Sequence, residues 1–380
     1  MKVYLDNAAT TAMDDRVIDA MLPFMKTHYG NPSSVHSHGR EVRSAIEKSR
    51  KKVAELLNAS PSEIFFTSGG TEADNTAITC GIETHGITHA ITSPLEHHAV
   101  LHTLEVCAAK GLIKLSILDV NEKGELNLDQ LEELLKSNPK SMISLMHANN
   151  EIGNLNDLKS IGSLAREYDA FFHSDTVQTM GHFVHDLKNL PVDAIVAGAH
   201  KFHGPKGSGF LYVRKDKKIH PFIYGGAQER NMRGGTENVI GIIGTSKALE
   251  IAYEDMAAHQ LQIENIKKHF IQSLTNEIPG VQFNGLSADL DKSLYTVLSV
   301  SLPPSETNRG MLLFNLDLEG ISASGGSACS SGASVGSHVL RALNHTADRD
   351  AVRFSFSRFN TIEEVDYTVG KLKEFYAVEA

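Results

Sequence analysis

The chain has 380 residues, of which 41% are hydrophobic and 22% are charged, and its formal net charge is -10 at pH 7. This composition is typical of a globular protein long enough for two lobes, and the acidic balance argues against a nucleic-acid binder or a basic membrane surface. No apolar run approaches the ~20 residues of a membrane span, and the N-terminus meets polar residues too early for a signal peptide.

The first two thirds of the chain alternate between strand and helix patterns. After a short polar turn at 6–11, helical patterns cover 14–27 and 37–57. The strands that follow are expected at 64–67, 89–92, 114–118, 142–146, 170–173, 192–197 and 210–213. Helices are expected from 71 onward and at 101–110, 128–136 and 158–168. This alternation predicts an α/β fold with a mostly parallel sheet covered by helices on both faces.

The pattern changes after about residue 237. A long helical region at 239–277, with a break near 256–259, leads into short strands (281–283, 296–301, 352–356) and helices (309–318, 337–343, 362–376). We therefore predict a large α/β domain over 14–256. The smaller α+β domain would combine 1–13 with 257–380 and carry a mobile loop at about 322–336.

The first strand ends carry a glycine turn and an imidazole. In a doubly wound sheet, ligands bind beyond the carboxyl ends of the strands. The strand at 64–67 is followed by Ser68-Gly69-Gly70-Thr71, where backbone N–H groups at the start of a helix suit a phosphate, unless the turn is a simple helix cap. The strand at 89–92 is followed by His97, which can stack on an aromatic cofactor or move protons.

Several other histidines raise the alternative of a metal site. His98 and His102 lie close to His97 in the sequence, and His200 and His203 follow a later strand. The chain has neither a carboxylate-rich cluster nor a His-Glu-x-x-His spacing, so we expect no metal.

Three further strand ends add an amide, a carboxylate and a lysine. Asn150 follows the strand at 142–146, and its amide can hold a carboxylate or a ring oxygen. Asp175 follows the strand at 170–173, where a carboxylate can keep a pyridinium nitrogen protonated, although an aspartate there is also a common helix cap. Lys201 lies between two apolar runs, where burial would favour a nucleophilic amine that forms a Schiff base. The alternative is an ordinary loop lysine.

The C-terminal part contributes a thiol and a guanidinium. Cys329 lies in a long loop of small residues, Ala323 to Gly332, and is expected to be exposed, whereas Cys80 and Cys107 lie in apolar helical segments and are expected to be core thiols. The three cysteines are too far apart for a disulfide framework or a zinc ribbon, which favours a reducing cytoplasm. Arg353, on a strand, is a suitable bidentate partner for a substrate carboxylate.

These residues lie in motifs that resemble the cysteine desulfurases of the NifS/IscS kind, in the class V branch of fold-type I pyridoxal-phosphate enzymes. The similarity runs nearly end to end, and it rests on the order and spacing of motifs such as YLDNAATT, YGNPSSVHSHGR, FTSGGTEADN, LEHHAV, HANNEIG, HSDTVQ, AHKFHGPKG, GGAQERNMRGGTENV, SGGSACSSG and VRFSFSRFNT. The resemblance implies pyridoxal 5'-phosphate as the cofactor. It also implies conversion of L-cysteine to L-alanine, with the sulfur passing to Cys329 as a persulfide.

The resemblance also assigns roles at the cofactor. It implies that Lys201 forms the Schiff base and that His97 stacks on the ring and serves as an acid or base. The remaining cofactor contacts that it implies are Asp175 to the pyridine nitrogen, Gln178 to the ring hydroxyl, and Gly70, Thr71 and His200 to the phosphate. Thr236 would reach the phosphate of the other subunit, which makes the enzyme a homodimer.

At the substrate, Asn150 and Arg353 would hold the cysteine carboxylate. A scaffold or carrier protein would then take the sulfur for iron–sulfur cluster assembly or another thiolation pathway. Alternatives within the fold are a selenocysteine lyase or another class V lyase or aminotransferase, neither of which needs Cys329. A thiol hydrolase with Cys329 as nucleophile would leave Lys201, Asp175 and the glycine turn without a role. A third alternative is a catalytically silent sulfur carrier or scaffold protein that keeps the fold.

Overall fold

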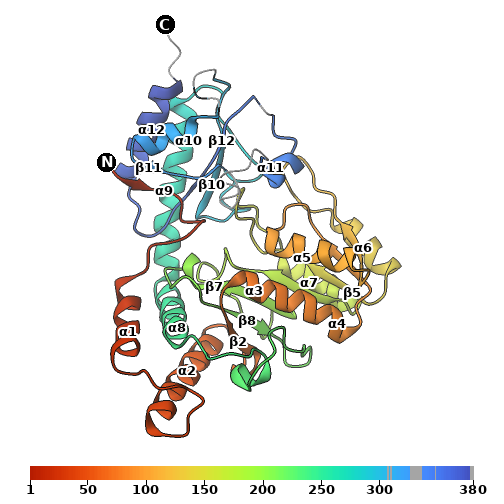
Figure 1. Ribbon diagram of the computed structural model, residues 1–380. Helices are drawn as coiled ribbons and strands as arrows, with labels where there is room; N and C mark the ends of the chain where they lie inside the picture. Colours follow the sequence, from red (N-terminus) through yellow and green to blue (C-terminus); the bar gives the residue numbers. More distant parts are fainter. Residues whose placement is uncertain (306–307, 309, 326–335, 347, 377–380) are drawn as a thin grey trace.

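The computed structural model describes residues 1–305, 308, 310–325, 336–346 and 348–376. A seven-stranded sheet forms the centre of the larger lobe (Figure 1), in the order β2-β8-β7-β6-β5-β3-β4. Its strands are β2 (Ile64–Thr67), β3 (His89–Thr92), β4 (Lys114–Ile117), β5 (Ser141–Ser144), β6 (Phe171–Asp175), β7 (Ala194–Gly198) and β8 (Gly209–Val213). Both pairs made by β8 are antiparallel and the other pairs are parallel, so the predicted mostly parallel sheet is confirmed.

Helices cover both faces of this sheet because alternate strand side chains point to opposite sides. One face, with Ile143 and Phe172, packs against α1 (Asp15–Lys26), α2 (Ser37–Leu56), α6 (Leu128–Ser137), α7 (Leu158–Glu167) and α8 (Val239–Glu254). The other face, with Met142 and Phe171, packs against α5 (His98–Ala109) and a helix that runs as α3 (Gly70–Asn75), the π-helical turn η2 (Thr76–Cys80) and α4 (Gly81–His85). Cys80 and Cys107 are buried in this second core, as predicted.

The smaller lobe has its own core. An antiparallel sheet of β12 (Ala351–Ser355), β10 (Val297–Ser301) and β9 (Gln282–Phe283) packs with α9 (Met256–Glu277), α10 (Leu312–Leu318) and α12 (Ile362–Tyr376). Its centre includes Phe270 and Phe354, whose ring centroids lie 4.9 Å apart. The short helix α11 (His338–Ala342) instead packs Val339 against Leu95 and Ile152 of the larger lobe.

The N-terminal segment joins the smaller lobe. Val3 and Leu5 belong to its core, and β1 (Val3–Tyr4) pairs in parallel with β11 (Ile321–Ser322). The sequence did not predict this pair because two residues are too few to show an alternating pattern.

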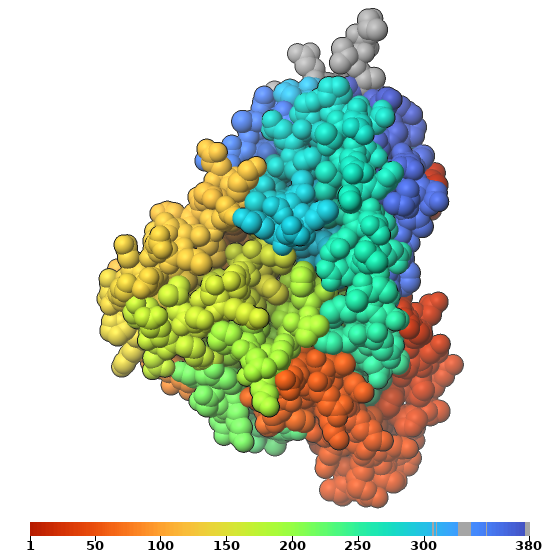
Figure 2. All heavy atoms as spheres, turned by 180° about the vertical axis from the view of Figure 1, so that it is seen from behind, coloured from red at the N-terminus to blue at the C-terminus, as the bar shows by residue number. Residues whose placement is uncertain are grey.

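The two lobes are linked by the helical region at 239–277. It divides into α8 and α9 at Asp255, close to the predicted break, and the two helices pack in different cores. Seen from the opposite side, they form a continuous green-blue band from the larger lobe to the smaller one (Figure 2). The exact domain boundaries stay a prediction. None of the described helices is both long and apolar enough to span a membrane.

Candidate active site

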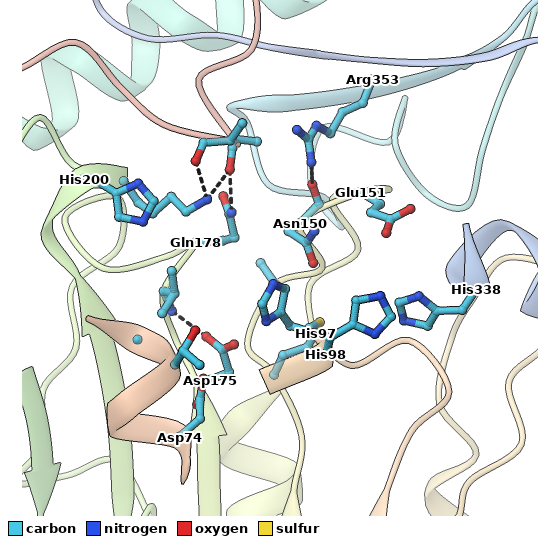
Figure 3. A pocket seen from close by; sticks show the side chains of 18 residues that line it. Asp74, His97, His98, Asn150, Glu151, Asp175, Gln178, His200, His338 and Arg353 are labelled. Carbon is cyan, nitrogen blue, oxygen red and sulfur yellow. Dashed lines mark hydrogen bonds between the residues drawn. The ribbon is translucent and has the colours of Figure 1, made fainter. Parts of the chain in front are cut away.

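A cavity of about 250 Å³ lies at one edge of the large sheet. Because β2 and β7 both pair antiparallel with β8, they run parallel to each other, so β2, β3, β5, β6 and β7 all end at this edge. The predicted site residues that line this cavity are Gly70, Thr71, His97, Asn150, Asp175, Gln178, His200, Lys201 and Arg353. Most of them are labelled in Figure 3.

Lys201 enters the cavity directly after β7, at the end of the 3-10 turn η3 (Ala199–Lys201). Its side chain is half-buried rather than fully buried, because it opens into the cavity. The Nζ atom donates hydrogen bonds to the backbone carbonyls of Ala8 and Ala9, the latter at 2.9 Å. The carbonyl of Ala8 also accepts a hydrogen bond from Nε2 of Gln178 at 3.0 Å. The Lys201 amine and the Gln178 side-chain amide therefore lie next to each other, because both donate to the Ala8 carbonyl.

Asp175 contributes a carboxylate to the cavity and His97 contributes an imidazole (Figure 3). Asp175 ends β6 and is 7% exposed; burial raises its pKa, while the charges of His97 and Lys201 and the N–H of Val177 oppose that shift. The Oδ1 atom of Asp175 accepts the Val177 N–H at 2.8 Å, within the turn that follows β6. No helix begins at this point of the described chain, so the helix-cap alternative for this aspartate is wrong.

His97 caps the N-terminus of α5. Its Nδ1 accepts the N–H of Ala99 at 3.1 Å, which places the proton of a neutral ring on Nε2. Burial lowers the pKa of His97, and the carboxylate of Asp175 opposes this shift. A neutral imidazole is therefore available to exchange a proton near neutral pH.

The glycine turn after β2 gives the backbone close access to the cavity. Gly69 has a φ of 151°, and a Cβ on Gly70 would lie 2.6 Å from Cγ2 of Val177. Only glycine fits at position 70, because the turn must approach the chain that follows β6. Thr71 is exposed at the start of α3, and His200 lies at the same cavity with its Nδ1 3.2 Å from Oγ1 of Thr10. Burial lowers the pKa of His200 to about 4, so its ring is neutral at pH 7.

Arg353 reaches the cavity from β12 of the smaller lobe and is only 1% exposed. Its Nη1 donates to the carbonyl of Asn150 and its Nη2 to Oδ1 of Asp6, both at 2.9 Å. The buried Nε has no partner among the described residues. The same Asp6 oxygen also accepts the Ser324 hydroxyl at 2.7 Å. Arg353 is thus fixed in place by two of its five N–H donors, and a guanidinium held in this way suits an incoming carboxylate.

Among the described residues, one predicted site residue lies away from this cavity. Thr236 is exposed and does not line it. Cys329 lies outside the described residues, as does most of the predicted loop at 322–336.

The structure also adds cavity residues that sequence reasoning missed. The carbonyls of Ala8 and Ala9 belong to a stretch read as a polar turn, and no local pattern signals a contact made some 190 positions away. Asp74, Glu151, His98 and His338 also line the cavity. The rings of His98 and His338 lie 4.5 Å apart; adjacency to His97 was the one available signal for His98.

The histidines near this cavity raise the question of a metal site. Within the ranges that the structure describes, no group of three or more His, Cys, Asp or Glu side chains is placed to hold a metal ion.

Comparison with known proteins gives a consistent result. The family model described as aminotransferase class-V matches residues 3–368. The cysteine desulfurase IscS of Dictyoglomus turgidum is 42% identical, covering 98% of this chain and 94% of its own length. A solved structure titled NifS-like protein is 38% identical with a TM-score of 0.88, covering 98% of this chain and 99% of its own. A structure titled SspA in complex with cysteine is 29% identical with a TM-score of 0.81, covering 95% and 100%.

Proposed function

Because this chain belongs to the class-V aminotransferase family, we propose that it is a pyridoxal-phosphate-dependent cysteine desulfurase. It converts L-cysteine to L-alanine and transfers the sulfur to Cys329. The observation that carries this proposal is the convergence of Lys201, Asp175, His97 and Arg353 on one cavity. The resemblance to cysteine desulfurases inferred from the motifs is confirmed by relatives of that name over nearly the full chain.

The residues of the cavity fit pyridoxal phosphate. The Lys201 amine, the buried Asp175 carboxylate and the His97 imidazole lie together. The amine would bond the aldehyde of the cofactor, the carboxylate would pair with the ring nitrogen, and the imidazole would stack on the ring. The glycine turn at Gly69 and Gly70, with Thr71 and the neutral His200, would hold the phosphate. Gln178 would reach the ring hydroxyl. When bound, the cofactor supplies an electron sink for the carbanion at the substrate Cα.

The side chains of the protein then have definite tasks. Arg353, with its unused Nε, and Asn150 would bind the cysteine carboxylate and so fix the Cα. The Lys201 amine would remove the Cα proton and return it, since it lies in the same cavity. The neutral ring of His97 would exchange a proton with the substrate thiol.

The sulfur transfer balances without an added oxidant. The thiolate of Cys329 attacks the sulfur of the substrate, an S–S bond forms, and the C–S bond breaks. The electron pair of that bond stays on the substrate carbon, which takes up a proton and becomes the methyl group of alanine. The products are L-alanine and a persulfide on Cys329.

The assembly and partners are part of the same proposal. A homodimer would bring Thr236 of one subunit to the phosphate of the other, since Thr236 is exposed and lies outside its own cavity. A scaffold or carrier protein would accept the sulfur for iron–sulfur clusters or other thiolation. We place the enzyme in the cytoplasm because a persulfide-forming thiol needs reducing surroundings. The alternative of a selenocysteine lyase or aminotransferase is not favoured, since the curated relatives carry the desulfurase name.

The decisive experiment supplies cysteine to the purified protein without a reductant and locates the persulfide by peptide mass spectrometry. We expect a yellow protein, an absorbance that borohydride bleaches, and an added sulfur on Cys329. Cys329→Ala should keep the colour and the affinity for cysteine but release no sulfide. Normal turnover by that variant, or a colourless protein that takes up no pyridoxal phosphate, would refute the proposal.

A further inference from the structure

We propose that Arg50, Glu229, Arg233 and Glu72 are positioning residues that hold the loop at 222–236 in the shape needed to present Thr236 to a second copy of this chain. The inference rests on the proposed function, in which Thr236 completes the phosphate site of the partner subunit. It concerns residues to which neither the motifs nor the cavity assigns any task.

The loop has an unusual backbone. Three consecutive non-glycine residues have left-handed conformations, Glu229 with φ 43°, Arg230 with φ 57° and Asn231 with φ 67°. Such a run persists only where the surrounding structure enforces it, and conformations of this kind are concentrated at functional sites.

The two ends of the loop, around Gly225 and Gly234, pack closely against each other. A Cβ on Gly234 would lie 2.6 Å from the Cα of Gly225, and the Gly234 N–H donates to the carbonyl of Ile223 at 2.9 Å. Gly235, with φ 100°, donates its N–H to Oε1 of Gln228 at 3.1 Å. The segment immediately before Thr236 is therefore fixed by glycine packing and backbone hydrogen bonds.

A buried ion pair holds the strained part of the loop. Nη1 and Nη2 of Arg50, on α2, donate to the two carboxylate oxygens of Glu229 at 2.7 and 2.8 Å, and the two side chains are 2% and 3% exposed. The backbone N–H of Phe66 donates to the same carboxylate at 2.8 Å. Because Phe66 lies in β2, the loop is attached to the strand that leads into the glycine turn.

A second ion pair attaches the loop to the glycine turn itself. Nε of Arg233 donates to Oε1 of Glu72 at 3.0 Å and its Nη2 to Oε2 at 3.3 Å. The same Oε2 accepts the N–H of Ser68 at 3.0 Å. The Glu72 carboxylate thus connects two segments. One is the glycine turn, which we assign to the phosphate of its own subunit, and the other is the loop that carries Thr236.

This arrangement is more than an exposed connection requires. Burying an arginine and a carboxylate costs desolvation free energy, and the left-handed residues add strain, whereas a surface loop with no task can relax. The end of the loop is nevertheless exposed at Thr236 and does not reach the cavity of its own chain. A rigid loop with an exposed hydroxyl at its end fits a ligand site completed by another subunit.

The test measures the dissociation constant of pyridoxal phosphate by titrating the apoprotein and following the visible absorbance. Thr236→Ala, Arg233→Gln and Glu229→Gln should each weaken binding about tenfold, the effect of one lost hydrogen bond to a phosphate. The double variant T236A/R233Q should be no weaker than T236A alone, because both changes remove the same contact. Arg233 is 29% exposed, so its replacement should not prevent folding.

The matched control is Arg166→Gln, which breaks an ion pair to the fully buried Asp193. Asp193 accepts the N–H of Phe172 near the start of β6, whereas Asp175 ends that strand, and neither Arg166 nor Asp193 lines the cavity. This variant should lower the melting temperature and leave the dissociation constant unchanged.

The outcomes separate the two proposals. A wild-type protein that takes up no pyridoxal phosphate refutes the proposed function, and this inference with it. A wild type that binds the cofactor, with R233Q and E229Q equal to it in affinity, overturns the inference alone. Unchanged binding in T236A refutes the proposed contact of Thr236 with the phosphate of the partner subunit, and this inference with it. Additive losses in T236A/R233Q overturn the inference alone.

Discussion

Arg353→Lys is the substitution that most directly probes how this cavity recognises its substrate. The change keeps the positive charge on β12 but replaces a planar fork of donors by a single ammonium. Nη1 and Nη2 of Arg353 donate to the carbonyl of Asn150 and the carboxylate of Asp6, each at 2.9 Å, and the buried Nε has no partner among the described residues. The three donors of a lysine ammonium diverge from one atom, so they do not reproduce the planar fork that pairs with a carboxylate.

The expected magnitude follows from these contacts. Loss of one charge-assisted hydrogen bond to the cysteine carboxylate corresponds to about 1.5 to 3 kcal/mol, or about a 10- to 100-fold increase in KM. The kcat should fall less, because the carboxylate is bound in the ground state and the transition state alike. Leaving a buried partner of Arg353 unbonded should also lower the free energy of unfolding by about 1 to 3 kcal/mol.

The assay is the release of alanine from cysteine in the presence of a reductant, compared with turnover of cysteamine, which is cysteine without its carboxylate. Wild type and R353K should process cysteamine with the same kcat/KM. The matched control is Arg349→Lys, an arginine just before β12 that donates to Oγ and the carbonyl of Ser301 and to the carbonyl of Gly280, away from the cavity. It should lose comparable stability but keep the KM for cysteine.

Two results would refute this reasoning. If R353K lost as much activity on cysteamine as on cysteine, the effect would lie in the architecture of the site and not in carboxylate binding. If R349K raised the KM equally, a general loosening of the smaller lobe would be the cause.

Three further predictions follow from the site and the buried histidines. Lys201→Ala should abolish the borohydride-sensitive absorbance, because no other amine lines the cavity in the described part of the chain; retention of that absorbance would identify another lysine. Asp175→Asn should keep the absorbance but lower cysteine turnover at least about 100-fold, since an amide cannot hold the pyridine nitrogen in its protonated form; near-normal turnover would contradict this role. Burial lowers the pKa of His173, His185 and His203 to about 3, whereas an unfolded histidine has a pKa near 6.5. The unfolded state therefore binds more protons than the folded state as the pH falls below about 6.5, and the folded state loses stability. Each of these histidines should therefore cost about 2 kcal/mol of stability at pH 5, and a melting temperature that stays constant from pH 7 to 5 would disprove this.

Much of the large lobe could be predicted from the sequence because its signals are local. Apolar runs of four to six residues between helical patterns define β2 to β8 within one or two residues, as at 64–67 and 89–92. The antiparallel orientation of β8 was not visible, since an apolar strand has the same composition in either direction. The pair β1–β11 was missed because it joins two residues near the N-terminus to two residues that lie beyond position 320.

The grouping of the predicted site residues was likewise determined by the sequence, because parallel strands that end at one edge bring the residues after them together. The order of the motifs alone placed Gly70, His97, Asn150, Asp175 and Lys201 in a common cavity. Only the tertiary structure decided what holds these side chains. The carbonyls of Ala8 and Ala9 bind the lysine amine, and Asp6 fixes Arg353. These contacts join residues 192 positions apart for Ala9 and Lys201 and 347 apart for Asp6 and Arg353, and such contacts leave no periodic signal in the chain.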